Sequence, residues 1–441
     1  MIRHKTNRFP SALFQQGVLL CLIVGGLESC DGKLNDRLKP TAHSQPTLQT
    51  MSLAWEKNLL FEQAFFESFG ERNAIKTQYV SNARLAEYQQ LLKARVSKPD
   101  LLEVDVVWPA ILAADLVDLR PYLKKETVNS FAPDLISSYT VRGRLVALPL
   151  FVDMGVLYYR SDLLAKYGFQ HPPQTWEELA QMAARIQQGE RRAGNRDFWG
   201  YLWQGSLSEG GTCNALEWQA SSGGGNFIEE TGRVHVRNPL FAAALRRATQ
   251  WMGNISPPAE YVYWEDDAMN IWDAGQTAFM RNWASGYGHV AEQSLAKHRS
   301  FAVAPLPAGP GGHRGTLGGL GMGVSKYAAN RDMAIRALLE LTDERHDLER
   351  LLATGGIPTH LAVGNRPDVI ARTSLLAISS TLMHSVVARP STLTAQKYDA
   401  ASRDYAKAVN SVLRGKATPE VAMAELEKEL VKLTGFSAQR D

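Results

Sequence analysis

The order of predicted strands and helices near the start of the chain limits the fold more than any other feature. Residues 52–55, 75–80 and 102–108 have the β-branched, aromatic and apolar content of strands. Between them, apolar residues recur at helical spacing over 59–69 and 85–92. Strands that alternate with helices in this way predict a parallel sheet with covering helices.

Polar and aromatic residues stand at the predicted carboxyl ends of these strands. Glu56 and Asn58 follow the first strand, and Asp105 and Trp108 close the third. Ligands of parallel sheets gather at this edge, so these four residues are candidates for ligand binding. The alternatives are a backbone hydrogen bond for Asp105 and a core position for Trp108.

A second informative stretch is residues 147–179. It begins as a near-continuous apolar run, which predicts a buried strand that Asp153 interrupts. A carboxylate is costly to bury without a partner, so Asp153 is expected to face a polar ligand or water. Gly168 ends the short helix predicted after the strand, and Thr175 with Glu178 forms a capping box that begins the next helix.

This stretch contains the motif LYYRSDLLAKYG followed by PPQTWEEL. Its sequence resembles that of the extracellular solute-binding proteins of carbohydrate ABC importers, in the maltose- and trehalose-binding-like group of family 1. The resemblance continues through residues 203–225, the motif Arg281-Asn282-Trp283 and the motif Ala388-Arg389-Pro390. In all, it covers roughly residues 50–435. It implies an α/β, two-lobed periplasmic-binding-protein (Venus flytrap) fold. Each lobe is then a sheet flanked by helices, with a ligand cleft between the lobes.

The resemblance also implies domain boundaries. The expected order is a signal peptide at 1–29, a lipid anchor and tether at 30–50, an N-terminal lobe at 51–154 and 305–345, and a C-terminal lobe at 155–304 and 346–435.

Sugar-binding residues follow from the same family phrases. Sugars offer apolar ring faces and many hydroxyl groups, which suit aromatic and planar polar side chains. The residues that the resemblance assigns to the ligand, besides the four above, are Phe151, Asp153, Gln204, Glu209, Trp283, Gly319 and Arg389. Without the resemblance, Arg389 is equally suited to a surface ion pair. Leu320 stands where the α-glucoside-binding relatives have Trp, so the identity of the sugar stays open.

The N-terminus indicates export. Basic residues at positions 3, 5 and 8 precede an apolar run at 18–24, which is too short to span a membrane. The sequence Leu27-Glu28-Ser29-Cys30 resembles a bacterial lipobox, in which Cys30 carries the lipid; ordinary signal cleavage near Cys30 is the alternative. Cys213 has no expected disulfide partner and is predicted to be a buried apolar residue.

Catalytic chemistry finds little support. The motifs HExxH, GxSxG and CxxC are missing, and the ten histidines are scattered, so no metal and no cofactor are expected. A net charge of +3 does not indicate nucleic-acid binding. Two carboxylates among Asp105, Asp153, Glu209 and Glu265 could hydrolyse a glycoside, but nothing in the sequence pairs them as acid and base.

The predicted function is therefore binding and not catalysis. We expect an exported, membrane-anchored lipoprotein, periplasmic or at the cell surface, that is a monomer and delivers sugar to the permease subunits of an ABC importer. The expected ligand is an α-glucoside disaccharide such as trehalose or maltose. Another oligosaccharide or a polyol is the first alternative, and a secreted glycoside hydrolase is the second.

Overall fold

The computed structural model describes residues 46–53, 56–80 and 84–439. All described residues belong to one compact unit, Gln45–Asp441. The predicted signal peptide and Cys30 lie outside them.

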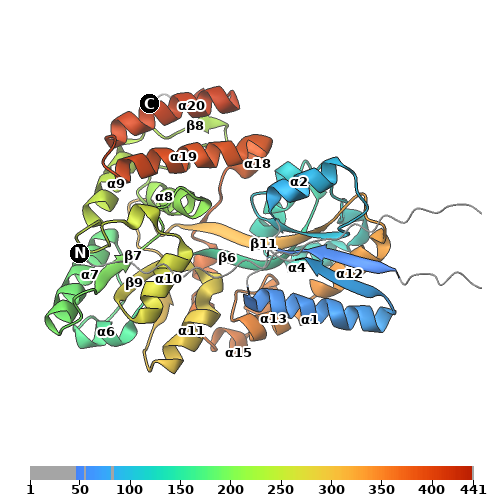
Figure 1. Ribbon diagram of the computed structural model, residues 1–441, viewed down its shortest axis with the longest axis horizontal. Helices are drawn as coiled ribbons and strands as arrows, with labels where there is room; N and C mark the ends of the chain where they lie inside the picture. Colours follow the sequence, from blue (N-terminus) through green and yellow to red (C-terminus); the bar gives the residue numbers. More distant parts are fainter. Residues whose placement is uncertain (1–45, 54–55, 81–83, 440–441) are drawn as a thin grey trace, which may run out of the picture. The chain divides into compact units, whose positions relative to one another are not determined.

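A single long strand, β6 (Leu148–Tyr159), connects the two halves of this unit. Its first part pairs antiparallel with β11 (Gly315–Val324), and its second part, from Gly155, pairs antiparallel with β9 (Thr277–Trp283). Eleven of its twelve residues are buried, which matches its near-continuous apolar sequence. Figure 1 shows β6 and β11 running between two groups of helices.

The sheet has nine strands in the order β2-β1-β3-β11-β6-β9-β7, with β10 on β6 and β12 on β11. The first three strands are parallel, whereas β11 runs antiparallel to both β3 and β6. The remaining bounds are β1 Thr47–Met51, β2 Lys76–Val80, β3 Leu101–Asp105, β7 Trp199–Leu202, β10 Ala302–Ala304 and β12 Val386–Val387.

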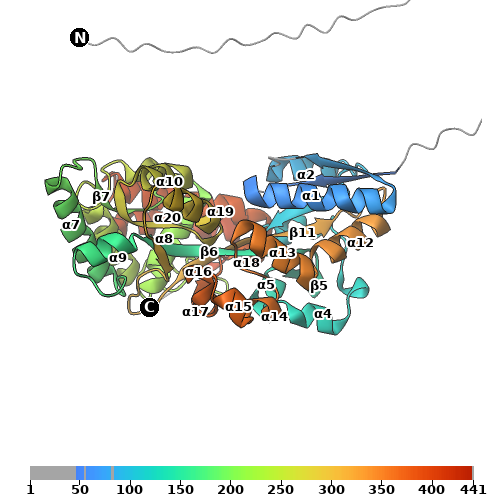
Figure 2. The same cartoon turned by 90° about the horizontal axis from the view of Figure 1, so that it is seen from below.

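Two hydrophobic cores define what we call the first and second lobes. The first core surrounds β1, β3 and α1, and the second surrounds α7, α8, α9 and the two C-terminal helices. In Figure 2, α1 and α2 lie on one side of β11 and α4 on the other. The main helices are α1 Glu56–Asn73, α2 Leu85–Lys93, α3 Pro109–Leu112, α4 Lys125–Ser130, α5 Pro133–Ser138, α6 Ser161–Lys166, α7 Trp176–Arg192, α8 Glu209–Ser221, α9 Pro239–Trp251, α10 Glu265–Ala274, α11 Tyr287–Ala296, α12 Arg331–Leu341, α13 Glu344–Thr354, α18 Ser391–Thr394, α19 Tyr398–Leu413 and α20 Pro419–Thr434.

The predicted fold class is confirmed: two lobes, each with sheet strands flanked by helices. One difference is that β6 joins the strands of both lobes into a single sheet. The predicted helix start at Thr175 is also confirmed, because its hydroxyl accepts from the Glu178 N–H at 3.2 Å.

Two stretches differ from the sequence analysis. The first strand is Thr47–Met51 and not 52–55, so it takes in the end of the stretch predicted as a tether. Pairing with β2 on one side and β3 on the other stabilises this polar segment as a central strand. Helix α13 packs against α1, with the His346 ring edge-on to Phe65 at 5.0 Å, although residues from 346 onward were assigned to the C-terminal lobe. The exact lobe boundaries stay a prediction.

Candidate functional site

Arg389 is the point at which predicted site residues from both lobes meet. It lies between β12 and α18, whereas Asp105 ends β3 and Glu209 begins α8. Arg389 Nη1 donates to Glu209 Oε1 at 2.7 Å, and Nη2 lies 3.8 Å from Asp105 Oδ1. Nη2 also donates to the carbonyl oxygen of Leu317 at 3.1 Å. One guanidinium therefore links a carboxylate of the first lobe to a carboxylate of the second.

Arg389 is buried, whereas the side chains of Asp105 and Glu209 are partly exposed. The Arg389 side chain is 3% exposed, compared with 32% for Asp105 and 41% for Glu209. Arg389 Nε has no acceptor among the described residues. Burial raises the pKa of Asp105, and the nearby charge of Arg389 opposes that rise. The two carboxylates can therefore accept hydrogen bonds from a ligand's hydroxyl groups while Arg389 stays fixed behind them.

Helix α19 holds Glu209 in place through two residues that the sequence analysis missed. The Tyr398 hydroxyl donates to Glu209 Oε1, and the Ser402 hydroxyl donates to Oε2 at 2.6 Å. Residues four apart share one face of a helix, so both hydroxyl groups point the same way. That spacing is visible in the sequence, but nothing there connects α19 to a carboxylate almost 190 positions earlier.

A small cavity of about 40 Å³ lies beside Arg389. Its lining comes from both lobes and consists of Val106, Val107, Ser138, Leu317, Ala388, Arg389, Ser391 and Thr392. It can hold water, but it is far smaller than the roughly 300–1,000 Å³ of ordinary ligand sites. This cavity therefore does not accommodate a ligand of ordinary size.

Trp283 has one ring face and one ring edge occupied by protein. The Arg281 guanidinium lies over the ring at 4.4 Å from its centre, and the indole Nε1 donates to Glu265 Oε1 at 3.1 Å. Arg281 is itself fixed by a fully buried ion pair with Glu217 at 2.5 Å. A Cβ at Gly318 would lie 2.8 Å from the ring, so a glycine is needed there for close approach. The indole is thus half-buried and rigidly held.

Asp153 has protein partners for both of its oxygens. Oδ1 accepts from the N–H of Met154 at 2.9 Å and of Ser285 at 3.0 Å, and Oδ2 accepts from the Ser285 hydroxyl at 2.6 Å. Burial raises the pKa of Asp153 to about 6, against the opposing effect of these hydrogen bonds. The expectation that Asp153 needs a polar partner holds, but Ser285 is that partner in this structure.

Phe151, Gly319 and Leu320 lie together where β6 pairs with β11. Phe151 and Leu320 face each other in register and are both buried. Gly319 has a φ of +125°, and a Cβ there would lie 2.5 Å from the Phe151 carbonyl oxygen. Leu320, in the place of the relatives' Trp, is therefore a core residue. Trp108 is half-buried, with its ring edge-on to Tyr88 at 5.8 Å.

The other predicted residues lie at different depths. Glu56 is the first residue of α1, and the side chain of Asn58 in the same helix has a buried Oδ1 with no donor among the described residues. Gln204 is fully buried: its Oε1 accepts from Arg281 and its Nε2 donates to the Arg281 carbonyl oxygen at 3.0 Å. Gln204 therefore supports the Arg281–Trp283 pair from behind and does not reach the surface.

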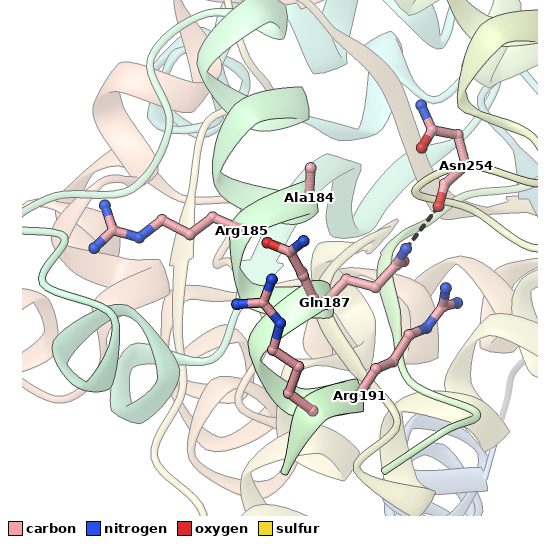
Figure 3. A pocket seen from close by; sticks show the side chains of 7 residues that line it. Ala184, Arg185, Gln187, Arg191 and Asn254 are labelled. Carbon is pink, nitrogen blue, oxygen red and sulfur yellow. Dashed lines mark hydrogen bonds between the residues drawn. The ribbon is translucent and has the colours of Figure 1, made fainter. Parts of the chain in front are cut away.

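Another hollow of the described surface lies elsewhere. It encloses about 580 Å³ along α7 and is lined by Ala184, Arg185, Gln187, Gln188, Arg191, Arg192 and Asn254. Figure 3 shows the Gln187 amide donating to the Asn254 carbonyl oxygen, at 2.6 Å, across this hollow. None of the predicted ligand-binding residues lines it, so the hollow is separate from the candidate site.

The described residues contain neither a cluster suited to a metal ion nor a helix suited to span a membrane. No three His, Cys, Asp or Glu side chains in residues 46–439 that the structure describes gather closely enough to hold a metal ion. Within the same part of the chain, no helix has the length and apolar composition needed to cross a membrane.

Comparison with known proteins shows the family to which the chain belongs. Residues 36–341 match the family model of the bacterial extracellular solute-binding proteins. The "Probable ABC transporter-binding protein" of Deinococcus radiodurans is 40% identical over 356 residues, which is 80% of this chain and 84% of that protein.

Solved structures agree. Maltose-bound MalE3 of T. maritima is 31% identical, with a TM-score of 0.78 over 88% of this chain and 99% of its own. A solute-binding protein of Thermotoga lettingae bound to α-D-tagatose is 22% identical, with a TM-score of 0.79 over 88% of this chain and 100% of its own, and so supports the fold alone. The chain belongs to the bacterial extracellular solute-binding proteins, which confirms its resemblance to the group that serves carbohydrate ABC importers.

Proposed function

We propose that this protein binds a small oligosaccharide between its lobes, and that the ligand is an α-linked glucose disaccharide such as maltose or trehalose. Among its relatives, MalE3 is described as maltose-bound, whereas the more distant T. lettingae protein holds a ketose. The bound sugar then passes to the permease subunits of an ABC importer. The protein acts as a monomer that closes on its ligand.

The observation that carries this proposal is the meeting of Asp105, Glu209 and Arg389. Asp105 belongs to the first lobe and Glu209 to the second, and both carboxylates are partly exposed. A hydroxyl group bonded to a charged side chain contributes about 1.5–3 kcal/mol. A ligand that reaches both carboxylates is therefore bound more tightly when the lobes are together, which shifts the population toward the closed state.

The exposed part of the half-buried Trp283 ring supplies the apolar part of the site. Arg281 covers one face, and the bond to Glu265 fixes the ring plane. A pyranose ring stacked on the exposed part adds the apolar contact that polar groups lack. Polar contacts and stacking together can reach the roughly −8 kcal/mol of micromolar affinity.

A thermal-shift and calorimetry panel tests the ligand. We expect maltose or trehalose to raise the melting temperature and to bind at micromolar concentration, and mannitol, ribitol and tagatose to bind more weakly. Tight binding of a polyol with no response to either disaccharide would replace the disaccharide by a polyol.

Hydrolysis is the alternative that this geometry disfavours. Glu209 accepts hydrogen bonds from Arg389, Tyr398 and Ser402, so both of its oxygen atoms already have protein partners. Incubation with a labelled disaccharide should return the sugar intact. Release of glucose by purified protein, lost in Glu209→Gln, would establish a hydrolase.

Lipid anchoring at Cys30 is part of the same proposal. The wild-type protein should partition with membranes when it is expressed in a bacterium that processes lipoproteins, and Cys30→Ser should release it into the soluble fraction. Cys213→Ser is the matched control, because Cys213 is buried in the described structure. A wild type that is fully soluble and lacks lipid by mass spectrometry would contradict the anchor.

A further inference from the structure

Two glutamates in the first lobe bury their carboxyl groups against each other. Glu62 lies on α1 and Glu103 on β3, and neither side chain has measurable exposure. Each carboxyl group has a protein donor at Oε2 only and leaves its Oε1 enclosed by protein without one among the described residues. Neither belongs to the candidate sugar site.

The hydrogen bonding of this pair requires a proton. Glu62 Oε2 accepts from the Tyr79 hydroxyl at 2.6 Å, and Glu103 Oε2 accepts from the Ser52 hydroxyl at 2.8 Å. The Oε1 atoms of both glutamates are enclosed by protein, with no donor among the described residues. Two ionised carboxylates only accept hydrogen bonds, so a bond between them exists only when one carries a proton.

The charges around the pair do not remove this requirement. Arg350, on α13, lies near both carboxyl groups, but its Nη1 and Nη2 donate to the carbonyl oxygens of Leu150 and Leu341, and it is 3.8 Å from Asp347. The other titratable groups facing the pair are the hydroxyls of Tyr79 on β2 and Tyr88 on α2, which are neutral. Burial raises the pKa of both glutamates, most of all that of Glu103.

The pair is connected to the segment that leads into the candidate site. Glu103 Oε2 accepts from the N–H of Leu53 as well as from the Ser52 hydroxyl. These two residues directly follow β1, and the first turn of α1 contains Glu56 and Asn58, both predicted ligand-binding residues. Asn58 also lies one helical turn before Glu62 on the same face of α1. The carboxyl of Glu103 thus fixes the start of the connection, and the carboxyl of Glu62 fixes the helix after it.

We propose that Glu62 and Glu103 share one proton and that this protonated pair positions the β1–α1 connection for sugar binding. The pair acts as a positioning device and does not itself touch the sugar. The part of this proposal that concerns sugar rests on the proposed function, whereas the shared proton does not. Loss of the proton leaves two negative charges in contact in a buried site, which separates the connection from β3 and weakens binding by the first lobe.

The test measures sugar affinity and the stability of the unliganded protein over a series of pH values. It compares wild type with Glu62→Gln and Glu103→Gln. The control is Glu67→Gln, because Glu67 is an exposed residue of α1. The glutamines carry permanent amide protons and keep the acceptors. The folded-state pKa values of Glu62 and Glu103 are raised, so the contribution of the pair to stability and to sugar affinity is complete at low pH. This contribution is lost as the pH rises through those pKa values. We expect wild-type and Glu67→Gln affinity to fall about tenfold per pH unit above that point. Each variant of the pair should lose most of this dependence.

Infrared spectroscopy separates this inference from the proposed function. At neutral pH, unliganded wild type should show the carbonyl band of a protonated carboxyl group, and the Glu62→Gln/Glu103→Gln double variant should lack it. A band that is missing in wild type, or one unchanged in the double variant, overturns the shared proton. A band with the expected behaviour but no sugar binding at any pH overturns the proposed function alone. Wild-type affinity that is flat to about pH 9 despite the band overturns the positioning role.

Discussion

Arg389 has oxygen partners on three separate segments of the chain, and its charge is almost completely enclosed. The side chains of its two carboxylate partners are partly exposed. Removing Arg389 leaves Asp105 and Glu209 close together without a cation between them, which is costly in a partly buried site. The residue therefore acts on both lobes at once.

Arg389→Ala should weaken disaccharide binding at least tenfold. The physical reason is that Asp105 and Glu209 lose the cation that fixes them and repel each other, which displaces the two carboxylates that are proposed to bind the sugar. Isothermal titration calorimetry measures the change, and Arg366→Ala, which breaks an exposed pair with Asp368 at 2.8 Å, is the control. Equal affinity of the Arg389 variant and wild type would remove Arg389 from the site.

Asp153 makes stability depend on acid pH. Its pKa of about 6 lies above the ordinary value of 3.8, so the folded protein holds the proton more tightly than the unfolded chain does. The free energy of unfolding should then fall as pH rises from about 4 to about 6, by an amount on the order of 1–3 kcal/mol.

Asp153→Asn should lose this part of the pH dependence, because the amide keeps the Oδ1 acceptor and can donate to the Ser285 hydroxyl. Urea unfolding at several pH values measures it, and Asp332→Asn, on an almost fully exposed side chain, is the control. A wild-type profile that rises from pH 4 to pH 6 in parallel with that of Asp153→Asn would contradict the raised pKa.

At the scale of elements, the β6–β11 pair connects the lobes and carries a bulge between Leu320 and Gly321. Gly319 stands next to this bulge, with a positive φ and with the Phe151 carbonyl oxygen where a Cβ would be. The backbone here is shaped by residues of both strands, and a side chain at 319 would push the strands apart.

Gly319→Ala should destabilise the protein by more than about 1 kcal/mol, because the close approach adds to the backbone strain. Gly143→Ala is a matched control, since Gly143 also has a positive φ, of +81°, but no atom within 4 Å of its Cβ position. Denaturant unfolding compares the two. Equal losses would mean that backbone conformation alone matters at 319.

The elements also show what a sequence can and cannot predict here. The strand in 147–160 and helix α7 are confirmed because their signals are local: an apolar run for the strand, and Thr175 as the N-cap of the helix. Strand β1 was missed because its polar residues are stabilised by two neighbouring strands that local propensity does not register. The partners of Glu209 on α19, and Ser285 beside Asp153, were missed for the same reason. They are contacts between positions more than 100 residues apart.

At the scale of the whole molecule, the proposed function depends on movement of the two lobes. The cavity of about 40 Å³ beside Arg389 is too small for a sugar ring, so the proposed binding mode requires the lobes to open for entry and to close on the ligand. Small-angle scattering should show a smaller radius of gyration with saturating maltose or trehalose, and a mass equal to one chain.

Asp105→Ala should need much more sugar to reach the same compaction, since it removes the contact of the first lobe. Lys124→Ala, in the same lobe but at an exposed position, should behave as wild type. A radius of gyration that does not change at saturation would contradict hinge closure, and a mass of two chains would contradict the monomer.

The place of β11 in the sheet has a consequence for the order in which the protein can be made. β11 lies between β3 and β6, yet it follows β3 by about two hundred residues. Until residue 324 has left the ribosome, β11 cannot take its place in the sheet of the first lobe. Both β3 and the first half of β6 then lack β11 as their neighbour. Contacts so distant in sequence form slowly. The sheet of the first lobe can therefore be completed only after roughly the first three quarters of the chain has been synthesised.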